Sequence, residues 1–229
     1  MVYALNGDGT AVGGWPKATG GFVRCSPAVV DLDGNGFLDV VVGSFDQRVH
    51  AWSGDGTALA GFPRLMSTDL ESSPVVADID GDGLSEVVIA GRNGKVYALN
   101  SDGTSVSGAA FPYVTTDDIR CTPLLADIDA DGAMEIVTGS DDGKIYSFDL
   151  PEDSYNPLNI QWPMFGRDAQ HSKVAGPFTE RAGSSGRPIG DPIAISSLAG
   201  GQGQDVSVQW DTTGALGEHA IYVQVDPDN

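Results

Sequence analysis

The hydrophobic positions of the chain form short runs that are separated by glycine, asparagine and aspartate. Runs such as "SPVVADI" (73–79), "EVVIAG" (86–91) and "VYALN" (96–100) are continuous or alternate with polar residues. Such lengths, and the β-branched and aromatic content, are typical of strands. No window shows a sustained apolar repeat at helical spacing, and 31 glycines and 13 prolines among 229 residues favour many turns. The pattern predicts an all-β chain.

The strand pattern is repeated along the chain. "VYALNGDGT" (2–10) returns as "VHAWSGDGT" (49–57) and "VYALNSDGT" (96–104), and a degraded copy, "IYSFDLPED", occupies 145–153. An aromatic–proline pair ends each unit, at Trp15-Pro16, Phe62-Pro63, Phe111-Pro112 and Trp162-Pro163. A repeat of 47 to 49 residues is in the range of a propeller blade.

Each unit reads as four short antiparallel strands joined by tight turns. Asn93-Gly94 and Asp142-Gly143 suit two-residue hairpin loops whose central residues need positive φ, whereas Asp46-Gln47 in the first copy fits this turn less well. Four strands in fewer than 50 residues, repeated in register, predict β-propeller blades. We expect a half blade at 1–20 and blades at about 21–66, 67–115 and 116–165. Because the chain opens inside a unit, we expect these blades to be part of a larger propeller.

An acidic nonapeptide, "DIDGDGLSE" (78–86), recurs as "DLDGNGFLD" (31–39) and "DIDADGAME" (127–135). Oxygen-bearing side chains stand at positions one, three, five and nine, with glycine at six, as in the oxygen-ligand loops that bind Ca²⁺. The backbone carbonyl of position seven would add a further ligand. We therefore predict three Ca²⁺ sites with these ligands: Asp31, Asp33, Asn35, Phe37 and Asp39; Asp78, Asp80, Asp82, Leu84 and Glu86; Asp127, Asp129, Asp131, Ala133 and Glu135.

The alternative reading of these nonapeptides is a metal-free turn, because aspartate and glycine dominate turns without any ion. Three copies in register argue against a metal-free turn. In addition, carboxylates that lie close together repel one another. At 4 Å the repulsion is roughly 1 kcal/mol in water and severalfold more near a protein surface. A cation in each loop would offset it, and the expected role is structural. All-oxygen ligation in a flexible loop favours Ca²⁺ over Mg²⁺.

The order "SPVVADIDGDGLSEVVIAGRNGKVYALNSDGT…FP" resembles the FG-GAP/VCBS blades of bacterial extracellular proteins and of integrin α-subunits. "WPMFGRDAQHS" (162–172) resembles the segment that often closes such propellers in secreted bacterial proteins. The resemblance covers residues 1–172 and implies calcium-loop blades. It also implies an extracellular or cell-surface location.

The last part of the chain has a different character. Residues 173–191 form a linker-like stretch rich in glycine, proline and serine. Residues 192–229 contain the alternating runs "DVSVQW" and "HAIYVQV" and resemble part of a CARDB-like, immunoglobulin-type domain of bacterial surface proteins. The resemblance implies a second β segment, incomplete in this chain.

The formal net charge is −20, from 32 acidic and 12 basic residues, and eleven of those carboxylates lie in the three nonapeptides. This balance argues against nucleic acid and anionic membranes as partners. There is no apolar run long enough to span a membrane. We expect the two cysteines, Cys25 and Cys121, to be small buried thiols without a disulfide, and His50 to be a packing residue.

No catalytic motif is present, and the three histidines stand in unrelated contexts. We therefore expect a non-enzymatic, calcium-stabilised binding or adhesion module of a secreted or cell-surface bacterial protein. Its ligand would be a protein or a carbohydrate held by propeller loops. The alternatives are an accessory propeller of an extracellular hydrolase or polysaccharide lyase, and a purely architectural spacer.

Overall fold

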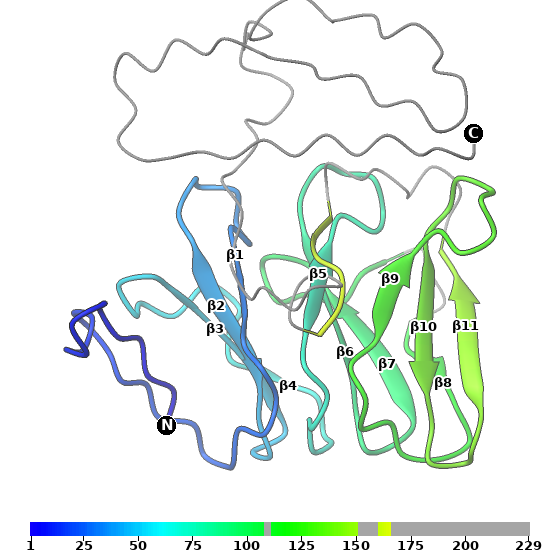
Figure 1. The fold of residues 1–229 in the computed structure, drawn as a ribbon, viewed down its shortest axis with the longest axis horizontal. Coiled ribbons are helices and arrows are strands. Elements are labelled where there is room, and N and C mark those ends of the chain that lie inside the picture. The colour runs from blue at the N-terminus through cyan, green and yellow to red at the C-terminus, as the bar shows by residue number, and fades with distance from the viewer. Residues whose placement is uncertain (108–110, 151–159, 166–229) are drawn as a thin grey trace, which may run out of the picture. The chain divides into compact units, whose positions relative to one another are not determined.

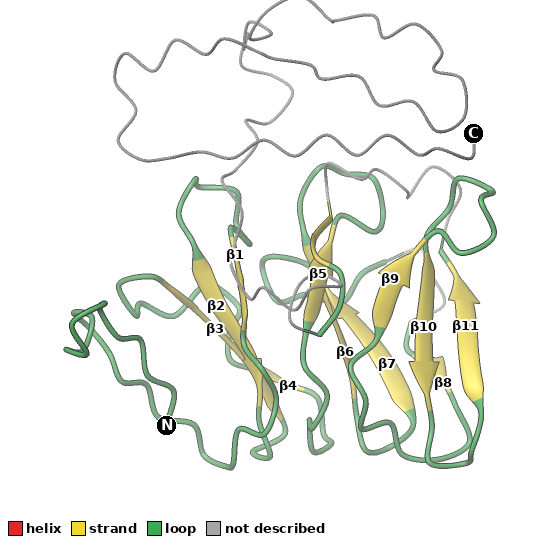
Figure 2. Cartoon of the chain, in the orientation of Figure 1, coloured by secondary structure: helices red, strands yellow, loops and turns green. Residues whose placement is uncertain are grey.

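The computed structural model describes residues 1–107, 111–150 and 160–165, all of which lie in the first of two compact units, Met1–Thr179. The predicted linker at 173–191 and the CARDB-like segment at 192–229 lie outside the described residues. Within the described part the chain is all-β, as the sequence predicts (Figure 2). That part has no helix of the length and hydropathy needed to cross a membrane.

The strands form three antiparallel sheets, and each repeat supplies all the strands of one of them except β12 (Figure 1). The first sheet has the order β1-β2-β3-β4, the second β12-β5-β6-β7-β8, and the third β11-β10-β9. The strands are β1 (Ala28–Val30), β2 (Asp39–Gly43), β3 (Arg48–Ser53), β4 (Arg64–Leu65), β5 (Val75–Ala77), β6 (Glu86–Ala90), β7 (Lys95–Leu99), β8 (Tyr113–Val114), β9 (Leu124–Ala126), β10 (Glu135–Gly139), β11 (Ile145–Asp149) and β12 (Ile160–Trp162). Ahead of them, the bridges Val2–Lys17 and Leu5–Ala11 form the outer hairpin of the predicted half blade.

The hydrophobic core lies between successive sheets. One cluster joins the first sheet to one face of the second, through residues such as Val41, Val76 and Ile89. Another joins the opposite face of the second sheet to the third, through residues such as Val88 and Ile136. All five residues of β6 are buried because alternate side chains enter different clusters. This two-sided burial explains the continuous apolar run at 86–91 and confirms the stacked, blade-type arrangement.

The outer hairpins of successive blades meet through glycines. Gly61, at φ +78°, lies so close to the next repeat that an added Cβ would stand 1.7 Å from the carbonyl oxygen of Asp102. The equivalent Gly14 approaches Asp55 in the same way, with a distance of 1.8 Å. The glycine before each of the first two aromatic–proline pairs therefore lets two backbones approach where no side chain fits.

The strand β12 does not take the place that the repeat predicts. The Trp162-Pro163 pair was expected to end a fourth strand of the third sheet, next to β11. Instead β12 pairs with β5, at Ile160–Ala77 and Trp162–Val76, and extends the second sheet (Figure 1, yellow). Trp162 is 2% exposed in the cluster between the first two sheets, so burial of its indole stabilises this pairing.

The hairpin turns differ from the two-residue type that the sequence suggests. In the turn between β6 and β7, the N–H of Gly94 donates to the carbonyl of Gly91 at 3.2 Å, and of the central residues only Gly94 has positive φ. This is a tight turn that ends in one left-handed residue. The first repeat adopts the same turn with Gln47 at φ 67° in the glycine's place.

Replacing Gln47 with glycine is therefore expected to stabilise the chain. A left-handed backbone costs a non-glycine residue about 1 kcal/mol, and the greater freedom of glycine in the unfolded chain offsets part of the gain. We expect a rise in melting temperature of about 1–2 °C by thermal denaturation. The reverse swap, Gly143→Gln at the equivalent turn of the third sheet, should lower the melting temperature. A Gln47→Gly protein less stable than wild type would contradict the turn assignment.

The cysteines have equivalent partners but differ in exposure. The Cys25 thiol, half-buried, donates to the carbonyl of Gly43 at 3.3 Å, and burial raises its pKa to about 11. Cys121 makes the matching bond to Gly139 but is exposed, so the expectation that both are buried is wrong for Cys121. In the second repeat Ser72 replaces them, with bonds of 2.9 Å to the N–H and carbonyl of Ala90. Both thiols are free, as predicted.

Candidate metal centres

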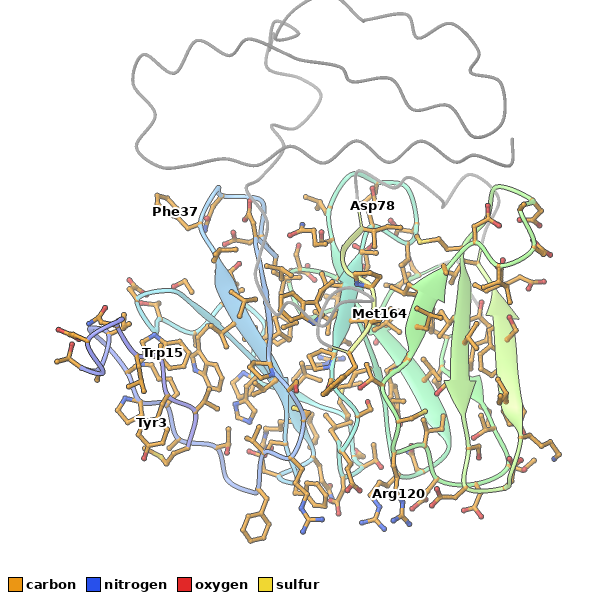
Figure 3. All side chains as sticks on the ribbon, viewed as in Figure 1. Tyr3, Trp15, Phe37, Asp78, Arg120 and Met164 are labelled. Carbon is orange, nitrogen blue, oxygen red and sulfur yellow. The ribbon has the colours of Figure 1, made fainter. Side chains whose placement is uncertain are left out.

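The three acidic nonapeptides form the loops between the first and second strands of each sheet, β1–β2, β5–β6 and β9–β10. Because the sheets are stacked in the same sense, these loops lie at one end of the described unit. Figure 3 shows Phe37 of the first loop and Asp78 of the second at this end, which we call the loop end, and Arg120 at the opposite end.

Each loop is folded back by hydrogen bonds from its own backbone to its first and last carboxylates. The first carboxylate accepts from the N–H of the glycine at position six, at 3.0, 3.0 and 3.2 Å for Asp31–Gly36, Asp78–Gly83 and Asp127–Gly132. The last carboxylate accepts from the N–H of position two, at 2.9, 2.9 and 2.7 Å for Asp39–Leu32, Glu86–Ile79 and Glu135–Ile128. These bonds recur in register and engage one oxygen of each carboxylate.

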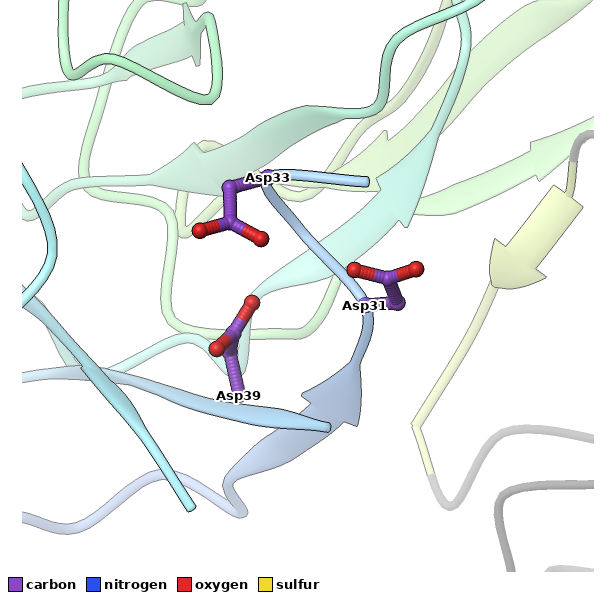
Figure 4. Close-up of side chains that lie close together, drawn as sticks. All are labelled: Asp31, Asp33 and Asp39. Atoms are coloured by element: carbon purple, nitrogen blue, oxygen red, sulfur yellow. The ribbon is translucent and has the colours of Figure 1, made fainter. Parts of the chain in front are cut away.

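The carboxylates at positions one, three and nine converge in every loop. In each loop one oxygen atom from each of the three side chains lies within 4.8 Å of the others; the groups are Asp31, Asp33 and Asp39; Asp78, Asp80 and Glu86; Asp127, Asp129 and Glu135. Figure 4 shows the first group, in which the three carboxylates face one small region. Oxygen ligands lie 2.3–2.6 Å from Ca²⁺, so two ligands of one ion can be at most about 5 Å apart. The observed spacing meets this limit.

Buried oxygen atoms without a hydrogen-bond partner occur in two of the loops. They are Oδ1 of Asp31 and of Asp39 in the first loop and Oε1 of Glu86 in the second. Asp39 and Glu86 are 0% and 1% exposed. A buried, unsatisfied carboxylate oxygen is costly, and a divalent cation would satisfy it. The residues present therefore fit a hard cation.

The last carboxylates of the first two loops have raised pKa values, which means that their ionised forms are disfavoured. Burial raises the pKa of Glu86 to about 8, and the charges of Asp80, Asp78 and Asp82 add to the rise, although the Ile79 N–H opposes it. Burial likewise raises the pKa of Asp39 to about 6, with smaller contributions from Asp33 and Asp31. A cation would reverse this effect by favouring the ionised carboxylates.

Comparison with known families agrees with this geometry. Residues 31–89 and 78–138 each match the FG-GAP-like repeat, and both matches begin at the first aspartate of an acidic loop. The chain contains FG-GAP-like repeats. No curated protein matches it.

Several solved structures resemble the described fold at low sequence identity. One is the V. cholerae biofilm matrix protein Bap1, with a TM-score of 0.43, 23% identity, and coverage of 62% of this chain and 24% of that one. Two others are BBS1N in complex with ARL6DN, soaked with mercury or with lead. Their TM-scores are 0.41 and 0.33 and their identities 16% and 14%, over 67% and 57% of this chain. The chain spans about half of BBS1N and a quarter of Bap1.

The position-five carboxylates of Asp82 and Asp131 are not part of the converging groups. The position-five side chains of Asn35, Asp82 and Asp131 accept from the N–H of position seven at 2.7, 2.7 and 2.8 Å. In the first loop, the Asn35 amide also donates to Asp33 at 3.0 Å. Ligation by these three side chains, and by the carbonyls of Phe37, Leu84 and Ala133, stays a prediction.

A glycine at position four of these loops was not singled out from the sequence. Gly34 and Gly81 have φ of 71° and 77°, and Ala130 takes the same conformation at 62° in the third loop. The N–H groups of Gly81 and Ala130 donate to the first aspartate at 2.8 and 2.7 Å. The repeated glycine at 34 and 81 was the available signal, because a left-handed residue is needed there to turn the N–H inward.

Carboxylates at the opposite end of the blades have arginine partners. Arg92 lies 3.2 Å from Asp118 and 4.0 Å from Glu71, Arg24 lies 3.7 Å from Glu71, and Arg120 lies 2.8 Å from Asp141. The pairs Arg24–Glu71 and Arg92–Asp118 link successive repeats, and the other two lie within one repeat. The first and last carboxylates of the acidic loops instead accept from backbone N–H groups.

The stability of the cation-free protein is expected to fall as pH rises from 5.5 to 8.5. Because the pKa of Glu86 rises from 4.5 to about 8 on folding, its contribution is full below pH 4.5 and is lost as pH passes 8. Asp39 contributes in the same sense, over the range from 3.8 to about 6. Saturating Ca²⁺ should remove this pH dependence, because the ion keeps these carboxylates ionised in the folded protein, as they are in the unfolded chain over this pH range. Thermal denaturation as a function of pH, in chelator and in Ca²⁺, measures the two pH dependences. The same pH dependence in both conditions would contradict Ca²⁺ binding by these loops.

Proposed function

We propose that the chain is part of a calcium-stabilised, non-enzymatic binding or adhesion module of a secreted or cell-surface bacterial protein. The observation that carries this proposal is the convergence of three carboxylates in each of three FG-GAP-like loops, with buried unpaired oxygens in two of them. Sites of this kind in extracellular modules bind Ca²⁺ with Kd of about 10⁻⁴ to 10⁻³ M. Such affinities suit a calcium-rich exterior.

The residues that would hold the ions are the predicted ligand sets of the three loops, with positions one, three and nine as their core. A bound Ca²⁺ supplies positive charge that offsets the repulsion between these carboxylates. Because each loop connects two strands of a sheet, ion binding would add to the free energy of folding of that blade. The proposed role of the metal is therefore structural.

The loop end also carries exposed apolar side chains that suit a binding surface. Phe37, Leu84 and Ile128, one from each loop, are 73%, 39% and 56% exposed. Aromatic and aliphatic side chains at a rigid loop tip can contact a protein or stack on a sugar ring. We propose that the partner, a protein or a carbohydrate, contacts this surface.

The proposal draws on the resemblance to FG-GAP/VCBS blades and to integrin-type calcium loops. We also propose that residues 192–229 are a CARDB-like segment, since both modules would belong to an extracellular protein. An accessory role beside an extracellular hydrolase or polysaccharide lyase would use the same surface. A purely architectural spacer would not need it.

Retention of protein-coated beads on immobilised ligands tests the binding role. The probes are panels of polysaccharides and of extracellular matrix proteins, in 5 mM CaCl₂ (roughly 5–50 times the expected Kd) or in chelator. We expect calcium-dependent retention on at least one probe, and loss of it in Phe37→Ser. The control is Phe22→Ser, which removes a phenylalanine of 72% exposure from the opposite end. No retention on any probe would favour the spacer, and equal retention of both variants would show that the partner does not contact the surface around Phe37.

A further inference from the structure

The strand β12 brings a side chain to the loop end that no repeat predicts. It pairs with β5 at Ala77, the residue directly before the second acidic loop. The register shifts between Ile160 and Trp162, so Gln161 is bulged out of the ladder. Bulges re-aim a side chain away from the regular alternation of a strand. Here the bulge turns Gln161 toward two acidic loops.

The amide of Gln161 makes three hydrogen bonds that join the first loop to the second. Its Oε1 accepts from the N–H of Asp31 at 3.2 Å, and its Nε2 donates to the carbonyl of Asp31 at 3.2 Å. Nε2 also donates to the hydroxyl of Ser85 at 2.7 Å. Asp31 is the first predicted ligand of its loop, and Ser85 lies between the ligands Leu84 and Glu86 of the next.

The residues beside Gln161 hold it in place. Trp162 is buried between the first two sheets, and the carbonyl of Pro163 accepts from the N–H of Leu125 in β9 at 3.0 Å. The segment 160–163 thus contacts elements of all three sheets. An amide held by such anchors loses little further rotamer freedom when it bonds to a loop.

We propose that Gln161 is a positioning residue that couples the first and second calcium sites. An ion in the first loop would order the Asp31 backbone, which fixes Gln161 and through it Ser85, beside the last ligand of the second loop. Coupling of this kind is reciprocal, so an ion in the second loop would raise the affinity of the first loop for Ca²⁺ by the same factor. The proposal rests on calcium binding by both loops. The third loop, to which no bond of Gln161 runs, serves as an internal reference.

Calcium titration of the ¹⁵N-labelled full chain, followed by NMR, resolves the sites. The amides of Gly36, Gly83 and Gly132 report on the three loops, because each donates to the first aspartate of its own loop. Asp33→Asn weakens the first site. We expect it to raise the Kd read at Gly83 about fivefold, at the low end of typical coupling, while Gly132 is unchanged.

Gln161→Leu keeps the size of the side chain and removes its hydrogen bonds. In this background, Asp33→Asn should leave the Kd at Gly83 unchanged. Ser85→Ala provides a second, milder test, because it removes the link to the second loop alone and should also abolish the coupling. Its use keeps the proposal testable if Gln161→Leu does not fold.

Two results would overturn the proposal in distinguishable ways. If all three glycines respond to Ca²⁺ but Asp33→Asn never affects Gly83, or still affects it in Ser85→Ala and Gln161→Leu, the coupling through Gln161 is wrong and calcium binding stands. If no glycine responds to millimolar Ca²⁺ (roughly the weak end of the range for extracellular sites), calcium binding itself fails and the coupling with it.

Discussion

Glu86→Gln is expected to stabilise the calcium-free protein and to destabilise the calcium-bound protein. Without the ion, the buried carboxylate lies beside Asp78 and Asp80 and has a pKa raised to about 8, so a neutral amide removes repulsion and desolvation. With the ion, the same substitution removes a charged ligand. Each effect is on the order of 2 kcal/mol at pH 8.5, or a shift of about 4–8 °C in melting temperature.

Asp102→Asn is the matched control for the opposite effects of Glu86→Gln without and with Ca²⁺. Asp102 lies in a turn outside the acidic loops, where it accepts from the N–H and hydroxyl of Thr104 at 2.9 and 2.6 Å. These bonds lower its pKa, so the substitution should destabilise the protein alike with Ca²⁺ and with chelator. Thermal denaturation under both conditions gives the comparison. A Glu86→Gln effect of one sign in both conditions would rule out a cation at the second loop.

Gly61→Ala is expected to destabilise the chain by about 2–4 kcal/mol, whatever the calcium concentration. Two effects add: the left-handed backbone costs alanine about 1 kcal/mol, and the new Cβ would overlap the carbonyl of Asp102. Because that carbonyl is backbone, a side-chain rotation cannot relieve the overlap. The outer hairpins of two blades must separate instead, with a fall in melting temperature of roughly 5–10 °C.

Gly143→Ala measures the free-energy cost of a left-handed backbone at alanine without a steric overlap. Gly143 has φ +81°, close to the +78° of Gly61, but nothing lies within 4 Å of its missing Cβ. We expect a loss of about 1 kcal/mol there. Chemical denaturation of both variants measures the difference, which is the contribution of the close approach between blades. Equal losses would show that the hairpins of successive repeats do not pack as described.

The parts of the fold that depend on local patterns were predictable from the sequence. Strand position followed from runs such as "EVVIAG", and the convergence of Asp78, Asp80 and Glu86 followed from the recurrence of acidic residues at the same positions of a tight loop. The in-register repetition then placed the equivalent loops at the same end of each sheet. Nothing more than local conformation and stacking was needed.

The features that depend on contacts between distant segments were not predictable in the same way. Trp162-Pro163 matches the pairs that end the other units, yet burial of Trp162 between two sheets outweighs the repeat pattern. Gln161 has no counterpart in the other units, so periodicity gave no signal for it. The exposure of Cys121 has the same kind of cause: a repeat position is buried only where a neighbouring sheet covers it.

Calorimetric titration of the calcium-stripped full chain with CaCl₂ tests whether the three acidic loops bind Ca²⁺. We expect saturable binding of about three ions per chain with Kd no weaker than about 10⁻³ M. Removal of the second site by Glu86→Gln should lower the stoichiometry to about two. Absence of saturable binding, with identical melting temperatures in Ca²⁺ and in chelator, would contradict it.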